Sequence, residues 1–298
     1  MYVRVRVPAT SANLGPGFDV AGLALTLYNT FTFELRDDDE LVITGCPAQF
    51  ANRDNLTYQA FVEGAKEVGL EFTGLTIDCS GDVPYTRGLG SSSTCIVAGI
   101  VAAYAFKDKA EDRQDILNLA TKTEGHPDNV APAIFGGLTV SVMHDDHVTT
   151  LSIPVYHDYR YVTLIPPFTL STQKARAILP QTLSRQDAIG NVSHLALMVA
   201  SLINGYDEGL KLGFHDRLHQ PYRGKLIDNY FPIMDILEQD EKVLGCYLSG
   251  AGPTIMALIR AEDTKGVVRI KDELGDLIDG WKVEKLELDE RGYVCDFL

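Results

Sequence analysis

The sequence predicts an α+β protein whose two domains share a cleft. Its 298 residues exceed the usual size of one hydrophobic core, and an apolar share of 45% supports more than one sizeable core. Three separate segments combine a glycine-rich turn with an apolar run, and such turns let the backbone approach a ligand closely. We place the domain boundary near Pro154, which gives domains of residues 1–154 and 155–298.

The first half contains strands and helices in a mixed order. Tyr2–Val7 and Thr30–Leu35 place apolar side chains at every second position, which predicts half-buried strands. Asn55–Val68 has apolar residues at helical spacing, with Asp54 or Asn55 as its cap. The remaining elements expected here are a strand at Leu75–Cys79, a helix from about Glu111 to Glu124, and a hairpin of Leu138–Val142 and Thr149–Ile153 around Asp145 and Asp146.

The second half predicts a ferredoxin-like domain. A strand at Tyr161–Ile165 ends at Pro166 and Pro167. The elements that follow are helices between about Thr172 and Leu237, a strand pair within Val243–Ile259, a helix near Thr264–Leu277 and a last strand from Val283. Their order, βαββαβ, is that of a ferredoxin-like arrangement.

Composition excludes several classes of partner. The chain has 26 basic and 41 acidic residues, and the formal net charge of −15 argues against nucleic acid and anionic membranes. Its five cysteines are scattered without metal-ligand spacing, which indicates reduced thiols. The start, MYVRVRV, alternates like a strand and unlike a signal peptide, and no apolar run is long enough to span a membrane. We therefore expect a soluble cytoplasmic protein.

The segment Val83–Phe106 predicts a phosphate-binding loop followed by a helix. Gly88 and Gly90 have no Cβ, so the backbone there can adopt positive φ close to an oxyanion. From Thr94 the chain is uncharged and apolar, typical of a buried helix whose first N–H groups and dipole face an anion. A Walker A loop requires a lysine where this chain has Ser91. The alternative is an ordinary strand-to-helix turn with serine caps.

The three glycine-rich motifs resemble those of one kinase superfamily. They are VPATSANLGPGFDVAGLAL at Val7–Leu25, PYTRGLGSSST at Pro84–Thr94 and LSGAGPTIMALI at Leu248–Ile259. In this order and spacing they resemble the GHMP kinases, whose PxxxGLGSSxx motif is matched with Ser93-Thr94 in place of the commoner small pair. Within that superfamily the chain is similar to homoserine kinases in EGHPDNVAPAIFGG (Glu124–Gly137), STQKARAILP (Ser171–Pro180) and QPYR, which ends at Arg223. The resemblance covers essentially the whole chain.

The resemblance implies a fold, a reaction and a nucleotide site. The fold is an N-terminal domain like ribosomal protein S5 and a C-terminal ferredoxin-like domain, often assembled as a homodimer. The reaction is ATP-dependent phosphorylation of L-homoserine to O-phospho-L-homoserine in threonine biosynthesis, with Mg²⁺ as cofactor. The ion would be held by Ser92 and Glu124, which offer the oxygen ligands that Mg²⁺ prefers. The implied ATP-binding residues are Pro84, Tyr85, Thr86, Arg87, Gly88, Leu89, Gly90, Ser91, Ser92, Ser93 and Thr94, with Asn55 near the base.

Each group of the acceptor implies a complementary side chain. By resemblance Arg176 and Arg223 bind the carboxylate, for which the planar guanidinium fork is suited. Asp19 would bind the ammonium group with help from Asn13. The resemblance also places Asn129 at the reacting hydroxyl with His126 close by, so that Asn129, Glu124 and Ser92 form the catalytic set. Without the resemblance, Glu124 and Arg176 would be interpreted as surface residues of helices.

Several alternatives remain open at this stage. Asp128 is a candidate general base, as in several GHMP relatives, but homoserine kinases are usually taken to lack one, and we favour positioning and electrostatics at Asn129. His194 lies on an apolar helical face and is more typical of a core histidine than of a site residue. A mevalonate-type kinase would need no partner for an ammonium group. A catalytically silent ligand sensor would be expected to lose the serine loop or the magnesium acid, both of which this chain retains.

Overall fold

The first domain is built around two long antiparallel strands, in which apolar and polar side chains alternate as the sequence predicts. The computed structural model describes residues 2–145 and 147–298. In β1 the side chains of Val3, Val5 and Val7 are fully buried while the arginines between them are exposed. The strands of the first sheet are β1 (Tyr2–Ala12), β2 (Ala21–Arg36), β3 (Leu41–Thr44), β4 (Gly74–Gly81), β5 (Leu138–His144), β6 (His147–Ile153) and β11 (Val294–Phe297). They run in the order β11-β1-β2-β4-β3, and the β5–β6 hairpin pairs with β2.

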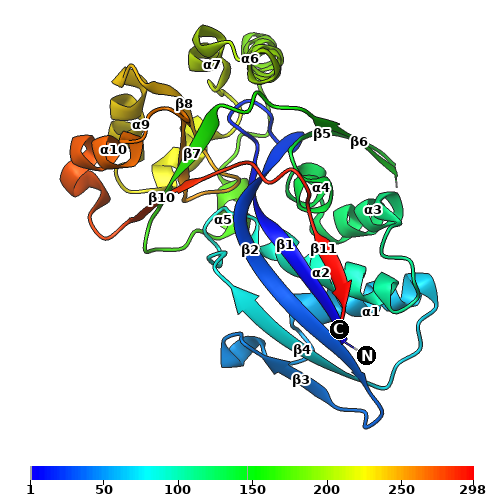
Figure 1. Cartoon of the computed structure of the whole chain (residues 1–298). Coiled ribbons are helices and arrows are strands. Elements are labelled where there is room, and N and C mark those ends of the chain that lie inside the picture. Colours follow the sequence, from blue (N-terminus) through cyan, green and yellow to red (C-terminus); the bar gives the residue numbers. More distant parts are fainter. Residues whose placement is uncertain (1, 146) are drawn as a thin grey trace.

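Four helices pack against this sheet (Figure 1). They are α1 (Leu56–Val68), α2 (Ser91–Ala105), α3 (Arg113–Glu124) and α4 (Pro127–Phe135). From Ile96 to Ala105 every residue of α2 is buried, because the helix is enclosed by the sheet on one side and by the other helices on the rest. This is why its sequence carries no charge. The start of α2, which bears the serines, is left at the edge of the core.

The second domain has the predicted ferredoxin-like topology. Its strands are β7 (Tyr159–Ile165), β8 (Val243–Leu248), β9 (Ile255–Arg260) and β10 (Lys282–Leu286), paired antiparallel in the order β10-β7-β9-β8. The helices are α5 (Thr172–Ala177), α6 (Arg185–Asn204), α7 (Asp207–Gly213), α8 (Gln220–Arg223), α9 (Tyr230–Gln239) and α10 (Gly266–Leu274), and short 3₁₀ turns lie at Ala48–Phe50, Gly224–Leu226 and Gly275–Ile278. The two-domain α+β prediction is thus confirmed.

Some elements differ from the sequence-based expectation. Strand β1 continues to Ala12 and β2 begins already at Ala21, so most of the first motif is strand rather than turn. Helix α4 and strand β11 were not expected. Because β11 pairs with β1, the end of the chain returns to the first sheet, and Figure 1 shows the two termini side by side. The domain ranges 1–154 and 155–298 remain a prediction. Of the predicted hairpin turn, Asp146 lies outside the described residues.

A shared core joins the two domains. Leu23 and Leu25 of β2 pack in one cluster with Tyr161 and Tyr247 of the second sheet and with Met198 of α6. Burial of large apolar side chains from both domains fixes the walls of the cleft between them. The five cysteines are free thiols, as expected. Within residues 2–145 and 147–298, no helix is long and apolar enough to cross a membrane.

Candidate active site

Two adjoining cavities form the candidate site. One, which we call the polar cavity, has a volume of about 110 Å³ and lies between the domains. The other, the apolar pocket, measures about 240 Å³ and lies in the first domain beside the starts of α1 and α2. Thr86, Ser91 and Ser92 line both cavities. A ligand with one apolar ring and an extended anionic chain can therefore occupy the two together.

The phosphate loop, residues 84–90, owes its path to two glycines. Gly88 and Gly90 have φ of +77° and +69°, in the left-handed region that favours glycine. A Cβ at Gly88 would collide with the carbonyl oxygen of Ser249, and one at Gly90 with the hydroxyl of Thr10. Helix α2 begins at Ser91 with no side-chain cap, so its first N–H groups remain available to an anion at the cavity.

A chain of buried hydroxyls ties the phosphate loop to the other two motifs. Ser249, in the SGAGP turn (residues 249–253), donates to the carbonyl oxygen of Gly88 at 2.5 Å. Its Oγ lies 2.7 Å from the Oγ of Ser11 on β1, and Ser11 also contacts the hydroxyl of Tyr247 at 3.3 Å. All three side chains are buried, where satisfied polar networks hold their geometry rigidly. The three glycine-rich motifs of the sequence thus meet at one point.

Ser92 and Glu124 form a second contact between distant elements. The Ser92 hydroxyl donates to Glu124 Oε2 at 2.9 Å, and the Ser93 hydroxyl lies 3.4 Å from Oε1. Glu124 ends α3, where the helix dipole disfavours a carboxylate. A local cation would compensate for that placement, and the two side chains offer only oxygen donors at the start of α2. This donor set fits a hard divalent cation such as Mg²⁺.

A charged pair crosses the polar cavity. Arg176 of α5 donates to Asp19 through both terminal nitrogens, at 2.7 and 3.1 Å. Asp19 lies in the β1–β2 loop (residues 13–20) with a left-handed φ of +58°. Asn13 accepts the Asp19 N–H at 3.1 Å and donates to the Gly250 carbonyl at 2.9 Å, so its amide joins this loop to the SGAGP turn. Both charges line the cavity and are partly exposed to it.

Arg223 is a buried cation without a carboxylate partner among the described residues. It is 1% exposed and donates to the carbonyl oxygens of Ala175 and Gly250 at 3.1 and 3.0 Å. His219 accepts a further bond from it at 3.3 Å, while His219 Nε2–H donates to Gly15 at 2.8 Å. Burial and the nearby charge of Arg176 lower the Arg223 pKa to about 10, so it remains charged at neutral pH. Such a charge at a cavity wall attracts an anion.

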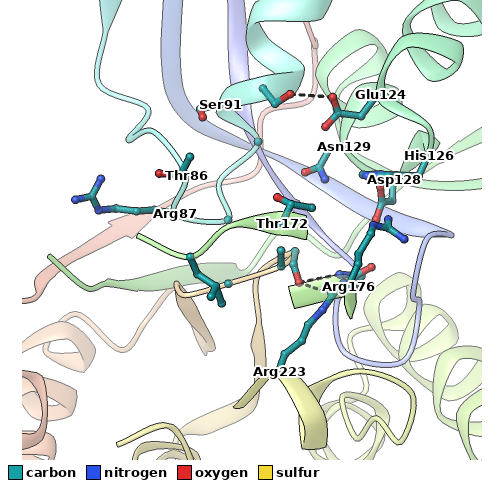
Figure 2. Close-up of a pocket in the computed structure, with 18 of the residues that line it drawn as sticks. Thr86, Arg87, Ser91, Glu124, His126, Asp128, Asn129, Thr172, Arg176 and Arg223 are labelled. Carbon is teal, nitrogen blue, oxygen red and sulfur yellow. Dashed lines mark hydrogen bonds and ion pairs between the residues drawn. The ribbon is translucent and has the colours of Figure 1, made fainter. Parts of the chain in front are cut away.

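The start of α4 supplies three polar residues to the same cavity. His126 donates from Nδ1 to Asp128 Oδ1 at 2.5 Å, and Asp128 is 2% exposed. Burial lowers the pKa of His126, but the hydrogen bond to Asp128 and its charge outweigh burial, so the pKa is raised above 6.5. Asn129 follows and accepts a hydrogen bond from Thr10 at 2.8 Å. Figure 2 shows Asn129, His126 and Asp128 on the wall facing Arg176.

We expect an NMR titration of His126 to give a midpoint above pH 6.5. Because the pKa is higher in the folded protein, protonation of His126 stabilises the fold. This contribution is complete below pH 6.5 and is lost as the pH rises through the raised pKa. Asp128→Asn removes the two largest effects that raise the pKa and leaves burial together with the smaller influences of Glu124 and Arg176, so the midpoint should fall below that of wild type. Asp263→Asn, which changes a carboxylate on a different ion pair with Arg269, is the control. An unchanged His126 midpoint in Asp128→Asn would contradict this assignment.

The structure gathers most of the residues expected from sequence. The polar cavity is lined by Asn13, Asp19, Glu124, His126, Asn129, Arg176 and Arg223, together with Thr86, Arg87, Gly88, Gly90, Ser91 and Ser92. The apolar pocket is lined by Asn55, Tyr85, Phe31 and Phe50, among others. The Asn55 amide caps α1 at Thr57 and Tyr58 and donates to Phe50, so it shapes the pocket and has little capacity left for a ligand.

Four residues of the predicted ATP-binding segment line neither cavity. Leu89 and Ser93 are fully buried, and Thr94 donates to Ser91 while it accepts from Asn29. Pro84 borders a different surface depression, beside Arg87. Their side chains therefore support the loop from behind. His194 contacts His215 with ring centroids 5.7 Å apart and likewise lines neither cavity, but it is half-buried and does not belong to the core.

Sequence reasoning missed several residues that shape the site. Thr172 lines the polar cavity, and its place four residues before Arg176 was a usable signal. His219 stands four residues before Arg223 at helical spacing, which also could have been noticed. Thr10 and Asn29 gave no such signal, because their partners Asn129 and Thr94 are distant in sequence.

Comparison with known proteins agrees with the fold and identifies the family. The family model for the GHMP kinases N terminal domain matches residues 55–137, and that for the GHMP kinases C terminal matches residues 201–277. A homoserine kinase of Clostridium botulinum (strain Okra / Type B1) is 45% identical over 296 residues, which cover 99% of this chain and 98% of that protein. A homoserine kinase of Clostridium acetobutylicum is 40% identical over 294 residues, 98% of this chain and 99% of the relative.

Solved structures show the same arrangement. The crystal structure of homoserine kinase from Cytophaga hutchinsonii matches with a TM-score of 0.87 and 26% identity, over 99% of this chain and 97% of that one. A putative homoserine kinase from Listeria monocytogenes matches with a TM-score of 0.80 and 28% identity, over 99% and 100% of the two chains. With relatives at 40–45% identity over nearly the whole chain and both GHMP kinase domain models matched, this chain belongs to the homoserine kinase family of the GHMP kinases.

Proposed function

We propose that this protein transfers the γ-phosphoryl group of ATP to the side-chain hydroxyl of L-homoserine, giving O-phospho-L-homoserine on the route to threonine. The family membership supports the reaction, and one observation supports the acceptor. The polar cavity presents an acid and two arginines on the wall opposite the phosphate loop, as a zwitterionic amino acid requires. Cytoplasmic location and a homodimeric assembly remain predictions.

The nucleotide is assigned across both cavities. Its base would lie in the apolar pocket between aromatic and aliphatic side chains, and its phosphates over Gly88–Ser92 at the start of α2. The N–H groups and dipole of α2 then stabilise the anionic chain without a P-loop lysine. Ser92 and Glu124 would hold the accompanying Mg²⁺, which neutralises phosphate charge when bound. Arg87 is held by the carbonyls of Tyr85, Pro166 and Pro167, so it stiffens the loop.

The acceptor would replace the ion pair that now crosses the cavity. Its ammonium group would face Asp19 and its carboxylate would face Arg176 and Arg223, so each charge regains a partner of opposite sign. Such an exchange leaves no buried charge without a partner, which keeps the cost of desolvation low. The hydroxyl end would then extend toward Asn129 and the phosphate loop. Asn13 contributes by holding the β1–β2 loop in place.

The chemical step is assigned to positioning and electrostatics. The acceptor hydroxyl oxygen forms a bond to the γ-phosphorus, the bond from that phosphorus to the β–γ bridging oxygen breaks, and the hydroxyl proton passes to a γ-phosphoryl oxygen. Asp128 Oδ1 is already occupied by the hydrogen bond from His126 Nδ1 at 2.5 Å, and its side chain is 2% exposed. We therefore assign no dedicated base, in keeping with the loose transition state of phosphoryl transfer.

A coupled assay of ADP release tests the proposal. With Mg²⁺ and ATP we expect turnover of homoserine and little turnover of serine, threonine, mevalonate, galactose or 4-hydroxybutyrate, which lacks the ammonium group. Asp19→Ala should lower kcat/KM for homoserine by about 30- to 1,000-fold, equivalent to roughly 2–4 kcal/mol for a lost charged partner. The same change should reduce the ratio of kcat/KM for homoserine to kcat/KM for 4-hydroxybutyrate.

The possible failures of this assay have different meanings. Turnover of mevalonate or galactose in place of homoserine would keep the superfamily and reject Asp19, Arg176 and Arg223 as acceptor ligands. Absence of ADP release with every acceptor would reject the kinase activity. Asp19→Ala with unchanged discrimination against 4-hydroxybutyrate would reject the ammonium contact alone.

A further inference from the structure

Thr10 joins the two halves of the candidate site. It lies near the end of β1 and is fully buried. Its Oγ–H donates to Asn129 Oδ1 at 2.8 Å, across 119 positions of the sequence. Its backbone N–H donates to the Leu89 carbonyl of the phosphate loop at 3.2 Å, and its hydroxyl occupies the space where a side chain at Gly90 would lie. One residue thus contacts both the loop that faces the nucleotide and the amide assigned to the acceptor.

The hydrogen bond from Thr10 fixes the direction of the Asn129 amide. With Oδ1 accepting the threonine proton, the Nδ2 group becomes the free end of the side chain, and it donates to no other described residue. Asn129 lines the polar cavity, so these N–H donors are available there. An amide locked in this way can donate to the acceptor hydroxyl oxygen or to the transferring group, and it cannot accept the hydroxyl proton.

We propose that Thr10 is a positioning residue that aligns the acceptor oxygen with the γ-phosphorus by locking Asn129 relative to the phosphate loop. The proposal rests on the proposed function, because it takes the roles of Asn129 and the loop from it. Alignment of this kind affects the chemical step rather than binding, since the carboxylate and ammonium contacts lie at other residues. A misplacement of about 1 Å is enough to cost on the order of 100-fold in rate.

The test uses two substitutions that separate the hydroxyl from the shape of the side chain: valine keeps the volume of threonine, whereas serine keeps its hydroxyl and lacks only the γ-methyl group. Thr10→Val removes the donor, and Thr10→Ser retains it. We expect Thr10→Val to lower kcat by about 10- to 100-fold while KM for homoserine and ATP stays within roughly threefold, and Thr10→Ser to restore most of kcat. Thr163→Val is the matched control, because Thr163 is also fully buried and donates one hydrogen bond, to the Glu284 carbonyl, outside both cavities.

A double-mutant cycle separates alignment from simple loss of packing. In an Asn129→Ala background, Thr10→Val should have little further effect on kcat, because the residue through which it acts is gone. An equal loss of kcat in both backgrounds would overturn the proposal, as would a Thr10→Ser variant as slow as Thr10→Val. A change confined to KM for ATP would assign Thr10 to the nucleotide loop instead and would also overturn it.

Failure of the proposed function can be told apart from failure of this inference. If wild-type protein does not phosphorylate homoserine, the function fails, and the cycle is then run with whichever acceptor wild type turns over. If wild type does phosphorylate homoserine and the cycle shows no coupling, only the role of Thr10 fails. Thermal unfolding of each variant shows whether it remains folded at the assay temperature.

Discussion

Arg223→Met should raise KM for homoserine by about 30- to several-thousand-fold, equivalent to roughly 2–5 kcal/mol for the loss of a desolvated charged partner. The reason is that Arg223 is fully buried at the cavity wall, is held in place by two carbonyls and His219, and has no carboxylate of its own among the described residues. Its charge is therefore available to an anionic ligand. Steady-state kinetics with homoserine as the varied substrate measure the effect.

The same variant should unfold at nearly the temperature of wild type. Burial of a lone charge opposes folding, as the lowered pKa of Arg223 indicates, and this offsets the hydrogen bonds that methionine cannot make. Arg223→Lys keeps the positive charge and loses the planar guanidinium group, so its KM for homoserine should lie between those of wild type and Arg223→Met. Arg260→Met is the control, since Arg260 pairs with Asp207 away from both cavities. A wild-type KM in Arg223→Met would exclude the carboxylate contact.

Glu124→Gln should lower kcat by about 100- to 1,000-fold, the usual range when one group that stabilises developing charge is removed. The amide cannot neutralise a divalent cation beside Ser92, so the Mg²⁺ concentration for half-maximal activity should also rise. Titration of activity with Mg²⁺ at saturating ATP and homoserine measures both quantities. KM for homoserine should change little, because the acceptor contacts are assigned to other residues.

Glu124→Gln should lower activity without lowering the stability of the fold. A carboxylate at the end of α3 opposes the helix dipole, so its neutralisation should leave the melting temperature unchanged or raised. Asp115→Asn is the matched control in the first turn of the same helix, where a negative charge is favourable. That variant should keep wild-type kinetics and lose a little stability. Wild-type kcat and Mg²⁺ dependence in Glu124→Gln would remove Glu124 from the site.

Three features of the fold could not be predicted from the sequence, and the structure gives the reason for each. The alternation in β1 stops at Val7 because both faces of the strand are buried from there to Ala12, between the helices and the second domain. Helix α4 contains Pro127 at its first position and Pro132 within it, and the second proline breaks the helical pattern. Strand β11 spans Val294–Phe297 and forms only because β1 offers a free edge.

What the sequence determined by itself is local. The glycines of the phosphate loop, the apolar helix behind it and the βαββαβ order all follow from neighbouring residues, because backbone freedom and periodic burial are properties of short segments. The motifs also named the candidate residues. What only the tertiary structure decided is how these residues meet. Arg176 and Asp19 are 157 positions apart, and Thr10 and Asn129 are 119 apart. Such contacts depend on the packing of two domains around a shared core, which no local pattern records.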